Sequence, residues 1–62
     1  MTRYRISNRK VIVTAETRDG IVILIQGPPI VRRFLGQSIG DLRRWFLEQG
    51  DHRWRMEVRG VW

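Results

Sequence analysis

The chain has 62 residues, no cysteine and a formal net charge of +6. A chain of this length forms one domain with a small core, because it buries only about 60% of its unfolded surface on folding. The absence of cysteine excludes a disulfide framework, and a single histidine, His52, excludes the usual clusters of metal ligands. We therefore predict one small basic domain over residues 1–62, with no bound metal and no cofactor.

The positive charge comes almost entirely from arginine. Lysine and arginine together number 12, against 6 aspartates and glutamates, and Lys10 is the one lysine. Arginine presents a planar fork of donors that suits phosphate and carboxylate groups, and it also stacks on flat rings. The excess favours nucleic acid, either DNA or RNA, as the partner, with an acidic protein as the alternative.

No stretch of the sequence is suited to a membrane. The longest aliphatic run, Ile21 to Ile25, is far too short to cross a bilayer. The first ten residues carry charges but lack the apolar stretch of a signal peptide. We predict a cytoplasmic protein that makes no membrane contact.

The first half of the chain has the patterns of strands. Arg3 to Ile6 alternates charged and apolar residues, as a half-buried strand does, and Ser7 to Lys10 is typical of a polar turn. Lys10 to Thr17 and Ile21 to Gln26 are rich in valine, isoleucine and threonine. Between them, Gly20 can adopt the positive φ that a tight hairpin needs, so these segments are predicted to pair.

The register of this hairpin decides which aliphatic residues share a face. A three-residue loop with Gly20 as a bulge segregates the aliphatics better than a two-residue Asp19-Gly20 turn, and we favour it. The strand at residues 21–26 would then be central, with aliphatic side chains on both faces. An uncovered aliphatic face marks an interaction surface and suggests a homodimer. Trp62, beyond Gly60, is less constrained and could cap the core, stack on a ligand or enter a partner's pocket. The predicted interaction surface consists of Ile12, Val22, Leu24 and Trp62.

The middle of the chain changes from strand to helix. Gly27-Pro28-Pro29 ends the sheet, because proline cannot donate a ladder hydrogen bond. Ile30 to Leu35 is predicted as a short further strand, or as a segment that folds over the second sheet face. An amphipathic helix is predicted from Ile39 to Gln49, with Ser38 as its N-cap and Gly50 after its end.

The last segment has the period of a strand. Trp54, Met56 and Val58 alternate with Arg53, Arg55, Glu57 and Arg59. The element order is therefore β-β-β-(β)-α-β, with three to five strands. We predict an α+β domain, in which a small antiparallel sheet carries one amphipathic helix on one face.

This arrangement would gather arginines on the outer face of the sheet. If the first and last strands belong to one sheet, their polar sides share a face, where several phosphates could be neutralised. The alternative is a solvated polar surface that discourages edge pairing. The five strand arginines and three others that could extend the surface are Arg3, Arg5, Arg53, Arg55, Arg59, Arg32, Arg33 and Arg43.

Catalysis is not expected. Asp51 and His52 form a lone acid and imidazole beside a turn, and a ribonuclease-like role for His52 needs a second group to hold the proton or stabilise charge. Trp45 and Trp54 lie on apolar faces and are predicted to belong to the core rather than to a base-stacking site. The leading hypothesis is a small nucleic-acid-binding or regulatory protein, and the alternative is a protein-interaction module or inhibitor.

Overall fold

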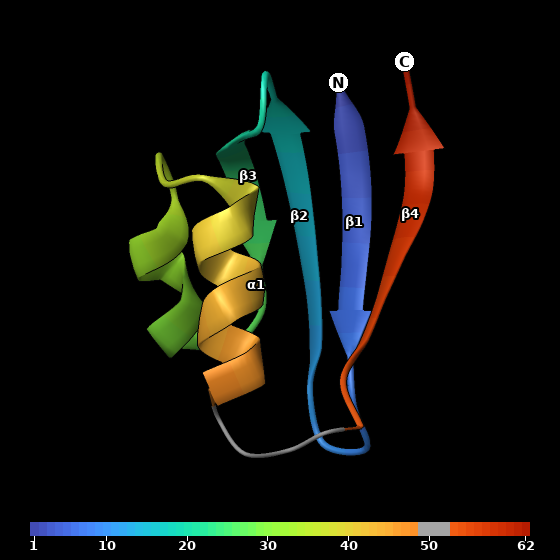
Figure 1. Ribbon diagram of the computed structural model, residues 1–62, viewed down its shortest axis with the longest axis vertical. Coiled ribbons are helices and arrows are strands. Elements are labelled where there is room, and N and C mark those ends of the chain that lie inside the picture. Colours follow the sequence, from blue (N-terminus) through green and yellow to red (C-terminus); the bar gives the residue numbers. More distant parts are fainter. Residues whose placement is uncertain (49–52) are drawn as a thin grey trace.

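The computed structural model describes residues 1–48 and 53–62. Its strands form one antiparallel sheet in the order β3-β2-β1-β4, with the helical segments on one side (Figure 1). The predicted α+β class is confirmed, and the first and last strands pair with each other, which meets the condition for their arginines to share a face. In chain order the elements are β1 (Thr2–Ser7), β2 (Ile12–Arg18), β3 (Ile21–Gln26), the 3-10 helix η1 (Pro29–Phe34), α1 (Ile39–Glu48) and β4 (Arg55–Val61).

The β2–β3 hairpin has a two-residue turn rather than the three-residue loop that we predicted. Arg18 pairs with Ile21, and the residues between them, Asp19 and Gly20, both have positive φ, of 54° and 79°. Two central residues of this kind give the turn a twist that matches the flanking strands. Aspartate tolerates a positive φ better than most residues with a side chain, and glycine adopts it freely.

A bulge in β3 changes which side chains of this hairpin face the core. Thr17 pairs with Val22 whereas Glu16 pairs with Leu24, so Ile23 is an extra residue in β3. The two-residue turn sets Val22 opposite the buried Thr17, so Val22 points into the core, where it is 1% exposed, and the bulge then puts Leu24 on the opposite face. The predicted exposure of Val22 is therefore wrong. The predicted central position of this strand is also wrong, because β3 lies at one edge of the sheet.

The segment after the two prolines forms η1 rather than a strand. Pro29 occupies the start of η1, where its missing N–H is not needed, and the Val31 N–H donates to the Pro28 carbonyl at 3.1 Å. Val31 and Phe34 are buried with the residues of α1. The segment therefore lies on the same side of the sheet as α1 and does not cover the second face.

The predicted N-cap of α1 is confirmed. The Ser38 hydroxyl accepts a hydrogen bond from the Asp41 N–H at 3.1 Å, which satisfies a donor that the first helical turn leaves free. Leu42 and Phe46 of α1 are buried against the sheet. The predicted end of the helix, at Gln49 and Gly50, lies outside the described residues.

The core lies between the sheet and the two helical segments. Trp45 and Trp54 pack against it as predicted, and the centroids of the Phe46 and Trp54 rings lie 4.2 Å apart. Val58 of β4 lies on the helix side of the sheet, as expected, but it lines a hollow beside Ile39 and Gly40 of α1 and is 59% exposed. The buried apolar residues are Ile6, Val13, Ala15, Val22, Val31, Phe34, Leu42 and Phe46.

Candidate nucleic-acid interface

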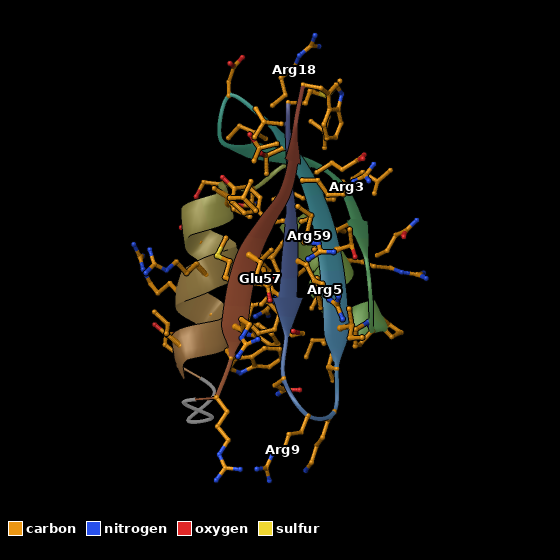
Figure 2. All side chains as sticks on the ribbon, turned by 90° about the vertical axis from the view of Figure 1, so that its right-hand side faces the viewer. Arg3, Arg5, Arg9, Arg18, Glu57 and Arg59 are labelled. Carbon is orange, nitrogen blue, oxygen red and sulfur yellow. The ribbon has the colours of Figure 1, made fainter. Side chains whose placement is uncertain are left out.

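The side of the sheet that faces away from α1 and η1 is called here the open face. Alternation along each strand and the observed pairing assign its residues, since Ile6, Val13, Ala15 and Val22 point the other way into the core. Figure 2 shows three of its arginines, from β1 and β4, projecting on this side. The open face consists of Arg3, Arg5, Ser7, Ile12, Thr14, Glu16, Leu24, Gln26, Arg55, Glu57 and Arg59.

Arg3 is held in place by a neighbour on each side. It pairs with Glu16 across the β1–β2 ladder, where its Nη2 and Nε donate to Glu16 Oε1 at 2.8 and 3.2 Å. On the β4 side its guanidinium lies 5.3 Å from the centroid of the Trp62 ring. The Arg3 charge is therefore largely balanced by Glu16, and its orientation is fixed.

A single carboxylate serves two arginines of β4. Glu57 Oε2 lies 3.4 Å from Arg59 Nη1, and Glu57 Oε1 lies 3.9 Å from Arg55 Nη1. All three side chains remain accessible, at 38% for Glu57, 77% for Arg55 and 51% for Arg59. Ion pairs this exposed contribute little to folding, so the two guanidinium groups stay available to an anionic ligand.

Arg5 lies at the centre of the open face. It pairs with Thr14 on β2 and with Glu57 on β4, yet within residues 1–48 and 53–62 its guanidinium makes no ion pair. Arg59 is the extra residue of a bulge in β4, because Tyr4 pairs with Val58 and Arg3 with Gly60. The bulge brings Arg59 beside Arg5, and both side chains line the same two hollows of the open face.

The two hollows differ in charge. The first has a volume of about 560 Å³ and mixes polar, apolar and charged groups, from Arg3, Arg5, Thr14, Glu16, Leu24, Gln26 and Arg59. The second has a volume of about 550 Å³, and the described residues that line it include five arginines and one carboxylate; they are Arg5, Ser7, Asn8, Arg9, Arg53, Arg55, Glu57 and Arg59. Positive charge is therefore concentrated at the end of the open face near the β1–β2 turn, where Figure 2 places Arg9.

Four of the five predicted strand arginines lie on the open face, and Arg53, which precedes β4, lines its second hollow. Arg9 was missed by the sequence reasoning. It lies in the turn after β1, at the end of the sheet where β4 begins, so the assumption that the first and last strands share a sheet was the signal that could have found it.

The other three predicted arginines belong to the opposite layer. The guanidinium of Arg33, on η1, lies 4.9 Å from the centroid of the Phe34 ring and 5.5 Å from that of Trp45. Arg32 is exposed beside it. Arg43 of α1 lines two hollows between the helix and β4. These side chains do not extend the arginine cluster of the open face.

The predicted aliphatic interaction surface is not continuous. Ile12 and Leu24 are 55% and 39% exposed on the open face, but Val22 is in the core. Ile12 pairs with Ser7 near one end of the sheet and Leu24 pairs with Glu16 towards the other, with Thr14 between them on β2. Trp62, the fourth residue of the predicted surface, is 56% exposed and lies against Arg3 rather than against these aliphatics.

The residues considered for catalysis, Asp51 and His52, lie outside the described residues. In the part of the chain that is described, no three or more histidine, cysteine, aspartate or glutamate side chains are grouped so that they could hold a metal ion. Of the helices in residues 1–48 and 53–62, none combines the length and apolarity that crossing a bilayer requires.

Fold and site together define a small antiparallel α+β domain with an arginine-rich open sheet face. A scan against protein-family models found no match, and neither did searches of curated proteins and of solved structures.

Proposed function

We propose that this protein binds nucleic acid through the open face and contacts the phosphate backbone with its arginines. One observation carries the proposal: arginines from β1, from β4 and from the flanking turn meet in one hollow, where Glu57 is the one carboxylate that residues 1–48 and 53–62 contribute. Guanidinium groups form paired hydrogen bonds with phosphate oxygens, and neutralising phosphates releases counterions. The protein would act in the cytoplasm, the location that we predict from the sequence.

The number of arginines in this hollow sets the expected salt dependence. If four or five phosphates are neutralised, log K should fall with log salt concentration with a slope of about −3 to −4.5. Affinity then comes mainly from charge rather than from base identity, so we expect weak sequence preference.

A salt titration of binding tests the proposal. Fluorescence anisotropy of labelled duplex DNA, single-stranded DNA and RNA should give the predicted slope. The variant Arg5→Ala/Arg55→Ala should reduce the magnitude of that slope by about 1.5 to 2, because it removes two phosphate contacts. Neither side chain is buried, so the fold should be retained.

A matched variant separates the open face from the net charge. Arg32→Ala/Arg44→Ala removes the same charge from exposed positions on η1 and α1. It should leave the slope nearly unchanged. Equal effects of the two double variants, or the absence of salt-dependent binding by the wild-type protein, would contradict the proposal.

A second candidate function is docking on an acidic protein surface. It is favoured by the internal carboxylates of the open face, since Glu16 and Glu57 already pair with Arg3, Arg55 and Arg59. A partner's aspartates and glutamates could take the same positions. Binding to an acidic polypeptide such as polyglutamate, with affinity greater than for an oligonucleotide of equal charge, would favour this candidate.

A further inference from the structure

The open face has two chemically different ends, and this difference bears on the kind of nucleic acid that it fits. We propose that it binds a single strand, with phosphates on the arginines of the second hollow and an unstacked base against the Trp62 ring. This inference rests on the proposed function and deepens it by naming the form of the nucleic acid.

The Trp62 ring is held on the open face. The backbone N–H of Trp62 donates to the Met1 carbonyl at 2.9 Å, which continues the β1–β4 pairing beyond β4. The ring packs over Gly60, because a Cβ built at that glycine would lie 3.7 and 3.8 Å from two ring atoms. The Arg3 guanidinium lies against the same ring. Trp62 is therefore oriented by its neighbours while more than half of it remains accessible to a ligand.

The first hollow, next to Arg3, offers groups that can meet the edge of a base. Thr14 presents a hydroxyl, Gln26 an amide and Glu16 a carboxylate, and Leu24 adds an apolar surface. Hydroxyl, amide and carboxylate groups are donors and acceptors that suit base edges. Only two arginines besides Arg3 reach this hollow, namely Arg5 and Arg59.

These two arginines also line the second hollow, where the positive charge is concentrated. The open face thus joins an arginine-lined track to a polar surface with an aromatic ring at its far end. Proteins that bind single strands combine a basic track for the backbone with aromatic rings on which bases stack. In a duplex, both faces of each base are covered by its neighbours, so Trp62 would have no base to stack on.

Replacing the ring tests the inference. Labelled oligothymidylate, oligouridylate and a DNA duplex of equal length are titrated with wild-type protein and with Trp62→Ala. We expect the wild type to bind a single strand more tightly than the duplex. The variant should lose about 5- to 100-fold in affinity for the single strand, the range of one base stacked on an aromatic side chain. Its affinity for the duplex should change less than about twofold.

Two further variants control for loss of structure. Trp62→Phe keeps an aromatic ring and should retain most of the single-strand affinity. Ile30→Ala removes an apolar side chain that is also 56% exposed, from η1 on the opposite layer, and should have no effect on either ligand. Circular dichroism melting of each variant shows whether the fold is intact.

The outcomes separate the inference from the proposed function. Salt-dependent binding in which Trp62→Ala changes nothing, or weakens single strand and duplex equally, would overturn the single-strand inference while leaving the proposed function standing. Tighter binding of the duplex by the wild type would overturn it too. Absence of salt-dependent binding to any of the three ligands would overturn both. Oligothymidylate and oligouridylate differ in the 5-methyl group of the base as well as in the sugar, so oligodeoxyuridylate is titrated beside them to identify the preferred sugar.

Discussion

Arg5 lies directly opposite Glu57 in the β1–β4 pairing, yet the Glu57 carboxylate is shared by Arg55 and Arg59. Arg55 and Arg59 lie two residues before and after Glu57 along β4, and their Nη1 atoms lie 3.9 and 3.4 Å from its carboxylate oxygens. Among the described residues, Arg5 is consequently left without an ion pair. A charged side chain without a counter-ion, among other arginines, is well placed to receive a phosphate.

The first prediction concerns Glu57. Changing Glu57→Gln removes the carboxylate that the described residues place in the second hollow, and it keeps the shape of the side chain. Nucleic-acid affinity at low salt should rise about 3- to 10-fold, since a negative charge near the bound phosphates is lost. Fluorescence anisotropy measures the change. The matched control is Glu48→Gln, which removes an exposed carboxylate from α1 and should change affinity far less. An unchanged affinity in Glu57→Gln would show that phosphate does not enter this hollow.

The second prediction tests the bulge that turns Val22 and Leu24 to opposite faces of β3. Val22→Ala should lower the free energy of unfolding by about 2 kcal/mol, because a side chain that is 1% exposed leaves a cavity when it is shortened. Leu24→Ala, on the open face, should cost about 0.5 kcal/mol or less. Urea denaturation followed by tryptophan fluorescence measures both values. Similar large losses in the two variants would indicate the register without the bulge, in which both side chains point into the core.

Elements that are decided by interactions between sequence neighbours can be predicted from the sequence, whereas elements that depend on packing between distant residues cannot. The alternation of Arg3 with Tyr4 and the N-cap at Ser38 are local, and both were read correctly. The bulge at Ile23 is not local, because it depends on Val22 and Ile25 both packing into the core. η1 itself was missed because a short apolar run after two prolines resembles a strand until its packing partners are known.

The arginine cluster was predictable in the same limited way. Alternation alone indicates that Arg3, Arg5, Arg55 and Arg59 share a face once β1 pairs with β4. It does not indicate which of them are balanced by carboxylates. That pattern follows from the register across three strands, which sets Arg3 beside Glu16 and leaves Arg5 beside Thr14.

The third prediction concerns the turn between β2 and β3. Gly20→Ala should lower the free energy of unfolding by about 1 kcal/mol, because an L-residue is disfavoured at a φ of 79°. Nothing surrounds the position within 4 Å, so the cost is conformational and not steric. The same substitution at Gly40, in the first turn of α1, should instead stabilise the protein by about 0.5 to 1 kcal/mol. Thermal melting of the two variants should therefore show shifts of opposite sign, and shifts of the same sign would contradict the turn geometry.

The fourth prediction concerns Arg3 and Glu16, whose side chains are 50% and 18% exposed. A double-mutant cycle with Arg3→Ala and Glu16→Ala should give a coupling energy of about 0.5 kcal/mol, the value typical of an ion pair that is partly accessible to solvent. Because the pair is charged, the coupling should shrink between low and high salt. Urea denaturation at both salt concentrations measures it.

The same two variants should affect binding in opposite directions, although they lose similar stability. Glu16→Ala releases Arg3 from its carboxylate and removes a negative charge from the first hollow, so nucleic-acid affinity should rise. Arg3→Ala removes a cation and the contact with the Trp62 ring, so affinity should fall. If both variants weakened binding equally, loss of structure would explain the result, and Arg3 would have no direct part in binding. A rise with one and a fall with the other requires that the charge on this part of the open face acts on the ligand.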